Sequence, residues 1–140
     1  MRRQATKLSL QIRHPSRDLA AVCKSLGRRP KVIWKRGEER RTPKGRRLGG
    51  KQERSYCTIE LGRASRTSLS SKMKAALLWL TPHRALVRRL VATGGEVSFC
   101  VGWFCDEHTG EALEAELLAA MADLGITLDL RLYVPDTPAK

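Results

Sequence analysis

Residues 96–105 form the most apolar stretch of the chain, and large apolar residues recur there at every second position. These positions are Val97, Phe99, Val101 and Trp103. Side chains on one face of a β-strand repeat with this period. The intervening residues are mostly small or apolar, so neither face of such a strand is strongly polar. A strand of this kind is typical of the interior of a sheet rather than its edge.

Four other segments have the pattern of strands. Residues 7–13 and 127–134 alternate between apolar and polar side chains, as half-buried strands do. Residues 31–35 and 55–61 are shorter and rich in residues that favour strands. The sequence therefore predicts about five strands, and residues 96–105 provide the most apolar of them.

Apolar residues spaced three and four apart predict helices between these strands. The first helix has Ser16 as its expected N-cap and Gly27 after its last turn. The second begins near Leu69, and Thr81-Pro82 starts a new helix within the same region. The last helix is expected over residues 111–124, with acidic side chains in its first turns.

The order β-α-β-β-α-β-α-β predicts an α+β fold with two layers. We expect a single, mostly antiparallel sheet of about five strands with helices packed on one face. A chain of 140 residues fits one domain. Residues 36–54 contain four glycines, one proline and almost no apolar side chain, so a flexible basic loop or a flexible hairpin tip is expected there. Residues 135–140 are expected to form a short disordered tail.

Charge is the most unusual property of the composition, because the formal net charge is +13. Of the 27 Lys and Arg residues, 25 lie in residues 1–91, whereas 9 of the 14 Asp and Glu residues lie in residues 92–140. Such asymmetry indicates either a surface for nucleic acid or an acidic partner, or a basic surface that the acidic part of the same fold neutralises. Net charge alone does not identify the partner.

The basic segment between Lys35 and Arg54 is the first candidate site. The cations proposed to contact nucleic acid are Lys35, Arg36, Arg40, Arg41, Lys44, Arg46 and Arg47, and Lys51 and Arg54 follow them. Arginine and lysine can neutralise phosphates, and Trp34 or Tyr56 can stack on bases. No helix-turn-helix, RNP or zinc-finger pattern accompanies them. The competing interpretation is a solvated, flexible run of charge.

A second candidate surface is the face of the sheet that the helices leave uncovered. The residues expected there are Lys31, Ile33, Lys35, Tyr56, Thr58, Phe104, Arg131 and Tyr133. Cationic and aromatic groups together suit an anionic or peptidic ligand. An ordinary exposed face or a homodimer contact explains the same residues.

Metal binding and catalysis have weaker support. The four cysteines, Cys23, Cys57, Cys100 and Cys105, contain no CxxC pair and are expected to be reduced, buried thiols. The spacing of Cys100, Cys105 and His108 is a poor match to structural zinc sites. The acid-base candidates Glu60, Asp106, Glu107, His108 and Asp129 would need to meet in one pocket. Because no nucleophile, phosphate-loop or metalloprotease motif is present, we expect no enzyme, no metal and no cofactor.

Several local signatures, spread over almost the whole chain, resemble a bacterial family known as domain of unknown function 4279. They are Leu26-Gly27 with Pro30, Trp34-Lys35-Arg36-Gly37-Glu38, Leu80-Thr81-Pro82, Gly95-Glu96-Val97, Val101-Gly102-Trp103-Phe104 and Leu130-Arg131-Leu132-Tyr133. The chain departs from the family in its arginine-rich loop and in Tyr56-Cys57-Thr58-Ile59, where a strand with tryptophan is more typical. The resemblance implies a fold rather than an activity.

Taken together, these patterns predict a non-catalytic binding or protein-interaction module in the cytoplasm, with an unidentified protein or peptide partner. The alternative is a nucleic-acid-binding protein that uses residues 36–54. No run of apolar residues is long enough to span a membrane, so no membrane association is expected. The chain is expected to be a monomer or a homodimer.

Overall fold

The computed structural model describes residues 4–105 and 108–134. Along the chain the elements are β1 (Gln4–His14), α1 (Leu19–Leu26), β2 (Val32–Trp34), β3 (Glu39–Arg41), β4 (Arg47–Lys51), β5 (Ser55–Glu60), α2 (Leu69–Leu80), the 3-10 turn η1 (Thr81–His83), α3 (Arg84–Ala92), β6 (Glu96–Cys105), α4 (Ala115–Asp123) and β7 (Ile126–Tyr133). The predicted disordered tail, residues 135–140, lies outside the described residues.

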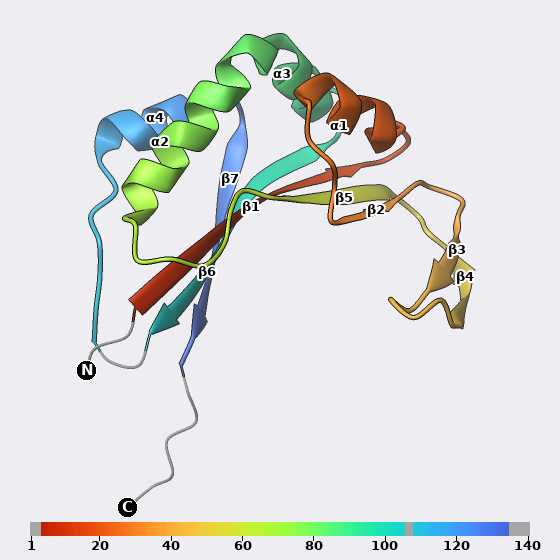
Figure 1. The fold of residues 1–140 in the computed structure, drawn as a ribbon. Coiled ribbons are helices and arrows are strands. Elements are labelled where there is room, and N and C mark those ends of the chain that lie inside the picture. Colours follow the sequence, from red (N-terminus) through yellow and green to blue (C-terminus); the bar gives the residue numbers. More distant parts are fainter. Residues whose placement is uncertain (1–3, 106–107, 135–140) are drawn as a thin grey trace, which may run out of the picture.

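Five strands form one sheet in the order β2-β5-β1-β6-β7. Neighbouring strands are antiparallel except for β6 and β7, which run parallel because α4 crosses over between them. The helices lie together on one face of this sheet (Figure 1). The predicted two-layer α+β fold is therefore confirmed, and the apolar strand β6 is interior, between β1 and β7.

The core lies between the sheet and the helices. The helix-facing side of the strands is continuous, and Leu10 of β1 lies opposite Ile59 of β5 and Phe99 of β6. The largest fully buried side chains are Phe99, Leu8, Leu10, Ile12, Leu19, Ile59, Leu69, Met73, Leu80, Leu90, Val22 and Val87. Antiparallel neighbours share a face, so this register places the alternate residues of β1, β5 and β6 on the open side of the sheet.

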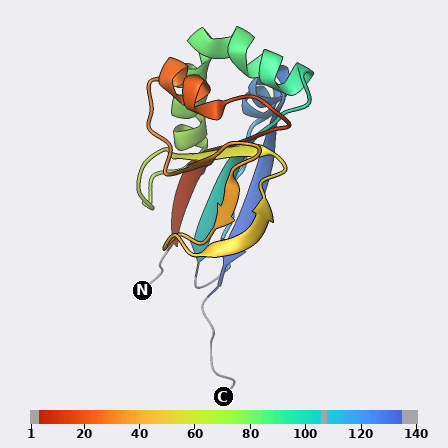
Figure 2. The same cartoon turned by 90° about the vertical axis from the view of Figure 1, so that its right-hand side faces the viewer.

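The structure adds a strand pair to the predicted order. Within residues 36–54, strands β3 and β4 form a separate two-stranded sheet beside the main one, which Figure 2 shows in front of the long strands. Its turn is closed by a hydrogen bond from Gly45 N to Thr42 O at 2.8 Å, and Gly45 has a φ of 91° that favours glycine. The mobility expected for this segment stays a prediction.

The first helix begins two residues later than predicted. Its N-cap is Asp18, whose carboxylate accepts a hydrogen bond from Ala20 N at 3.0 Å. The expected cap, Ser16, is engaged differently, because Ser16 N and Arg17 N both donate to His14 Nδ1, at 3.1 and 2.9 Å. The imidazole therefore holds the chain in a turn at Ser16, and Asp18 is the first side chain free to cap the helix.

The last helix is also shorter than predicted, because it begins at Ala115 rather than at residue 111. Glu111 instead caps α2. Its carboxylate accepts hydrogen bonds from Leu69 N at 2.9 Å, Ser70 N at 2.7 Å and the Ser70 hydroxyl at 2.6 Å. Burial alone would raise the pKa of Glu111, but the hydrogen bonds from Ser70 and Leu69 and the charge of Lys72 lower it overall. The segment before α4 is thereby fixed to the start of α2.

Replacing Glu111 with alanine should lower the free energy of unfolding by about 0.5–2 kcal/mol, the usual effect of losing an N-terminal cap. Urea denaturation measures this change. Glu114→Ala is the matched control, because Glu114 stands at the N-cap of α4 without a side-chain cap bond. An equal loss in the two variants would contradict the capping role of Glu111.

The buried His14 predicts a pH-dependent stability. Burial is the main cause that lowers the pKa of His14 below 6.5, and the charges of Arg17 and Arg54 add to the effect. Since Nδ1 accepts two hydrogen bonds, the neutral ring carries its proton on Nε2, which lies 2.8 Å from Thr93 Oγ1. The unfolded chain therefore binds a proton more readily than the folded chain does.

The free energy of unfolding should consequently fall as the pH drops below about 6.5, before the carboxylates begin to titrate. Thermal melting over this range measures the effect. His14→Gln should flatten the dependence, even though it lowers stability at every pH. His83→Gln should retain the dependence, and a flat profile for the unmodified protein would refute the interpretation.

Candidate functional site

The candidate site is a cleft of about 750 Å³ where the β3–β4 hairpin meets the open face of the main sheet. We call it the aromatic–cationic cleft, because it is lined by Arg13, Trp34, Arg40, Gly50, Lys51, Gln52, Glu53, Arg54, Ser55 and Tyr56. Figures 1 and 2 show the hairpin at the end of the sheet formed by β2 and β5. The lining thus comes from β1, β2, β3, β4, β5 and the segment that joins β4 to β5.

Strand register builds the floor of the cleft. Tyr56 of β5 lies directly opposite Trp34 of β2 on one side and Arg13 of β1 on the other. The Trp34 and Tyr56 rings are 4.6 Å apart between centroids and tilted by 32°. The Arg13 guanidinium lies 5.1 Å from the centroid of the Tyr56 ring, within the range of a cation–π interaction. Three residues distant in sequence therefore form one continuous row.

Hydrogen bonds that involve backbone groups tie the hairpin to this floor. Trp34 Nε1 donates to Arg54 O at 3.1 Å, and Arg36 N donates to the buried Ser55 hydroxyl at 3.1 Å. Gln52 bridges the two arms, because its O accepts from Gly37 N at 2.8 Å and its N donates to Glu38 O at 2.7 Å. These hydrogen bonds therefore fix the conformation of the base of the hairpin, even though residues 36–54 have almost no apolar side chain.

The predicted basic residues do not form one cluster. All seven are exposed, and of these Arg40 lines the cleft. Arg41 and Arg47 share the carboxylate of Glu39, at 2.9 and 3.4 Å. Lys35, Arg36, Lys44 and Arg46 are the other predicted cations, and they are not part of the cleft lining.

Arg13 is the cation of the cleft lining that lies outside the predicted basic segment. The alternating pattern of β1 indicates only that Arg13 faces away from the core. No sequence pattern indicates that Arg13 lies near residues 36–54. Among the described residues, no carboxylate forms an ion pair with Arg13 or Arg40. Arg54 donates to Gly94 O at 3.2 Å and lies 3.9 Å from Glu96. The positive charge of the cleft is therefore only weakly neutralised.

Elsewhere, acidic and basic groups neutralise each other within the fold. Asp123 of α4 pairs with Arg84 at 2.9 Å and with Arg88 at 2.5 Å, both on α3. This pairing corresponds to the interpretation in which the acidic part of the chain offsets its basic surface. Part of the charge asymmetry thus serves the fold, whereas Arg13 and Arg40 of the cleft have no such ion pair within the described residues.

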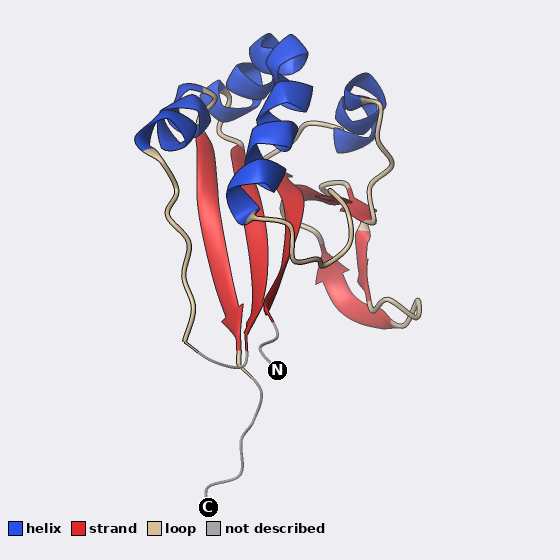
Figure 3. Cartoon of the chain, turned by 60° about the vertical axis from the view of Figure 1, so that its left-hand side comes forward, coloured by secondary structure: helices blue, strands red, loops and turns tan. Residues whose placement is uncertain are grey.

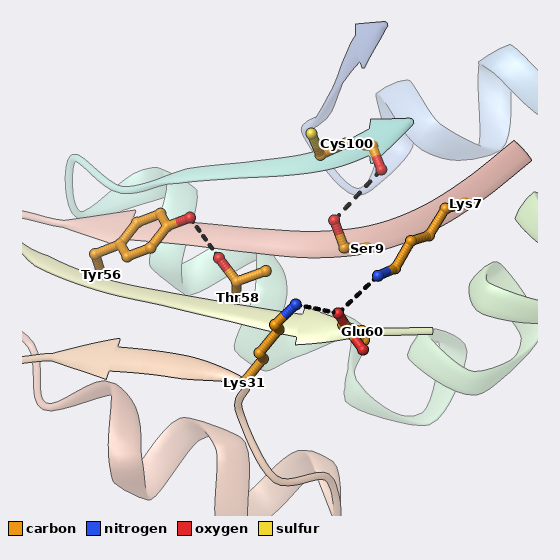
Figure 4. A network of polar contacts seen from close by, with 7 residues as sticks. All are labelled: Lys7, Ser9, Lys31, Tyr56, Thr58, Glu60 and Cys100. Atoms are coloured by element: carbon orange, nitrogen blue, oxygen red, sulfur yellow. Dashed lines mark hydrogen bonds and ion pairs between the residues drawn. The ribbon is translucent and has the colours of Figure 1, made fainter. Parts of the chain in front are cut away.

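The open face beside the cleft carries a polar network, shown in Figure 4. Glu60 lies 2.8 Å from both Lys31 and Lys7, and Ser9 donates to Cys100 O at 3.4 Å. Tyr56 and Thr58 share a short hydrogen bond between their hydroxyls. Hydrogen bonds from Lys31 and then Lys7 lower the pKa of Glu60 to about 2. These two lysines are therefore already paired with a carboxylate.

One predicted member of the open face is wrong. Ile33 lies opposite the buried Cys57, so it points toward the helices, and Trp34 takes the open-face position. Tyr56, Thr58 and Lys31 belong to the open face, as the register and the contact with Glu60 require. Phe104 and Tyr133 also lie there and stack on each other at 4.9 Å between centroids.

No metal-binding group of three or more His, Cys, Asp or Glu residues occurs within residues 4–105 and 108–134. Glu60 on β5 and Asp129 on β7 are separated by β1 and β6, a distance of roughly 14 Å at about 4.8 Å per strand. Asp106 and Glu107 lie outside the described residues. Cys23 and Cys57 are buried free thiols 3.7 Å apart, and burial raises the pKa of both. Cys100 and Cys105 are half-buried free thiols, less enclosed than predicted.

A family model described as Domain of unknown function (DUF4279) matches residues 4–135. The chain belongs to this family. The match confirms the resemblance inferred from the local signatures, and it covers every strand and helix of the fold. No curated protein and no solved structure gives a significant match to this DUF4279 chain. None of the described helices has the length and apolarity needed to cross a bilayer.

The Glu60 network gives a direct test of the open face. Nuclear magnetic resonance titration should give Glu60 a pKa of about 2, because Lys31 and Lys7 stabilise the carboxylate. Lys31→Ala should raise this pKa toward the ordinary value of 4.5. Lys35→Ala removes one exposed positive charge that lies outside the network and should leave the pKa unchanged. A Glu60 pKa near 4.5 in the unmodified protein would contradict the network.

Proposed function

We propose that this member of DUF4279 is a non-catalytic binding module whose ligand is an acidic segment of a partner protein, held in the aromatic–cationic cleft. The observation that carries the proposal is the placement of Arg13, Arg40 and Arg54 around the Trp34–Tyr56 pair. The arginines supply charge for carboxylates, and the aromatic rings supply apolar surface for the rest of a peptide.

Two features of the arginines support an anionic ligand. Arg13 and Arg40 have no ion pair within the described part of the chain, so binding a carboxylate there does not require an existing pair to break. Arginine also binds carboxylates through two parallel hydrogen bonds, which gives geometric specificity as well as affinity. Lys7 and Lys31 of the open face differ in this respect, because both already form an ion pair with Glu60.

The chemistry of the lining supports binding rather than catalysis. The residues that line the cleft include no histidine and no cysteine, and Glu53 is their one carboxylate. A general acid–base mechanism needs a group with a suitable pKa within hydrogen-bonding reach of the substrate. Arginine, tryptophan and tyrosine in an open cleft are instead the residues that dominate binding surfaces.

Single-stranded nucleic acid is a second candidate ligand. The observation that favours it is the exposed row of cations on the hairpin beyond the cleft, in which Lys44 and Arg46 have no ion pair within the described residues. A strand of nucleic acid would stack a base on the half-exposed aromatic pair and place its phosphates along the hairpin. A short acidic peptide in the cleft has no need of the hairpin tip, and this difference separates the two candidates.

Fluorescence anisotropy with a labelled peptide of glutamate and aspartate, and with a single-stranded RNA of mixed sequence, tests the proposal. Two variants each remove two positive charges: Arg13→Gln/Arg40→Gln in the cleft and Lys44→Gln/Arg46→Gln at the hairpin tip. The cleft variant should weaken peptide binding by at least about tenfold, because each lost charge-assisted hydrogen bond contributes about 1.5–3 kcal/mol. The tip variant should bind the peptide as the unmodified protein does.

RNA binding would give a different pattern. Both variants should then weaken the complex, and the logarithm of affinity should fall with the logarithm of salt by about 0.7 for each phosphate neutralised. Equal, small effects of both variants on the peptide would show non-specific attraction and overturn the proposal. So would the absence of any binding at low salt. Thermal melting verifies that each variant is folded.

A further inference from the structure

Strand β7 forms one edge of the sheet, and no described strand pairs with its outer side. Figure 3 shows it as a long strand at the end of the sheet opposite the hairpin. Natural proteins protect exposed edges with short strands, charges, bulges or covering segments. The other edge, β2, is only three residues long. β7 has eight residues and exposes several large apolar side chains, which is unusual for an unpaired edge.

The exposure of these side chains increases along the strand. On the helix-facing side, Ile126 is 6% exposed and Leu128 is half-buried, but Leu130 is 48% and Leu132 is 62% exposed. The reason is that α4 precedes β7 directly and lies over the start of the strand (Figure 3). The end of β7 therefore leaves a row of leucines beside the covered core residues Val101 and Trp103.

The opposite face of β7 carries one acidic and one basic residue. Asp129 and Arg131 are two residues apart, share the open face and form an ion pair at 3.3 Å. Tyr133 follows on the same face and stacks on Phe104. The edge therefore presents leucines on one face and a pair of opposite charges on the other. The β7 edge of a second copy of the chain can complement both features.

We propose that two copies of the chain associate by antiparallel pairing of their β7 edges, centred on Leu130. Opposite residues in an antiparallel pair lie on the same face of the sheet. A two-fold axis perpendicular to the sheet must then pass through a residue position, because neighbouring residues of a strand point to opposite faces. This restricts the pairing to a few registers, which differ in the charges they bring together.

The register centred on Leu130 is the one that both uses the full strand and matches the charges. It places Asp129 of each copy opposite Arg131 of the other, Leu130 opposite Leu130, and Leu128 opposite the exposed Leu132. Centring the pair on residue 129 would oppose two aspartates, and centring it on residue 131 would oppose two arginines. Like charges directly opposite are destabilising. Shifting the axis by a further residue in either direction shortens the pairing: centring on residue 128 leaves Leu132 without an opposite residue in β7, and centring on residue 132 leaves Leu128 without one.

Such a dimer would have one continuous ten-stranded sheet, since each copy contributes the five strands of its main sheet. The aromatic–cationic clefts would lie at its two far ends, because β2 and β7 are opposite edges of each sheet. The association therefore leaves both clefts accessible and makes the protein bivalent. It does not depend on the ligand proposed for the cleft.

Sedimentation velocity over a micromolar to millimolar concentration series tests the proposal, with a charge-swap cycle at two positions. In Asp129→Arg each copy would place arginine opposite Arg131, and in Arg131→Asp each would place aspartate opposite Asp129. Both single variants should weaken dimerisation by at least about tenfold, because two symmetric pairs change from attractive to repulsive. The double variant Asp129→Arg/Arg131→Asp restores opposite charges and should recover the dimer.

Arg29→Asp is the matched control, because it reverses one exposed charge in the segment before β2, at the opposite edge of the sheet, and should leave dimerisation unchanged. Thermal melting shows whether each variant is folded, and recovery in the double variant separates loss of pairing from loss of folding. A monomeric unmodified protein throughout the series would overturn the proposal. So would a dimer that the single variants leave intact, or one that the double variant fails to recover.

Discussion

The structure depends on the pairing of β1 with β5 on one side and β6 on the other. Leu10 lies opposite Ile59 and Phe99, and all three side chains are completely buried beneath the helices. Because side chains alternate between the faces of a strand, a shift of one residue in β1 would transfer its whole apolar set to the open side. Burial of this row fixes the register of the three interior strands.

The same register positions the candidate site. Once Leu10 and Ile12 face the helices, Arg13 must lie on the open face opposite Tyr56, and β2 then adds Trp34 to the row. The cations and rings of the cleft are therefore held by the packing of the opposite face. The hairpin completes the cleft through hydrogen bonds, chiefly those of the Gln52 backbone and of the Trp34 indole to Arg54 O, rather than through a core of its own.

Alternation was sufficient to predict most of the sheet, because β1, β5, β6 and β7 each have one consistently apolar face. It failed for β2, where Val32, Ile33 and Trp34 are all apolar and their pattern does not distinguish the two faces. Pairing with β5 decides that Ile33 points inward. The two errors in where helices begin, at α1 and α4, result from side-chain contacts that helical periodicity does not describe. The imidazole of His14 displaces Ser16 as a cap, and Glu111 reaches α2 across 41 or 42 positions of sequence.

Arg13 could not be assigned to the site for a related reason. Its position predicts exposure, but its proximity to Arg40 and Arg54 results from strand order, which apolar periodicity does not determine. The basic segment itself was visible in the sequence, yet its cations differ in availability once the structure is known. Glu39 engages Arg41 and Arg47, whereas Arg40 lines the cleft and forms no ion pair with a carboxylate of the described residues.

The two edge strands of the sheet, β2 and β7, differ in how far they are protected from pairing with another strand. At one end, β2 is short, and the chain continues directly into the hairpin that forms the cleft. At the other, β7 extends along β6 for its full length, but α4 covers only its start. Backbone donors and acceptors along such an edge gain most from a partner strand, and exposed leucines add apolar surface. The core that fixes the register of β1 thus leaves two chemically distinct surfaces at opposite edges of the sheet. The cleft beside β2 is cationic, and the edge of β7 is apolar with self-complementary charges.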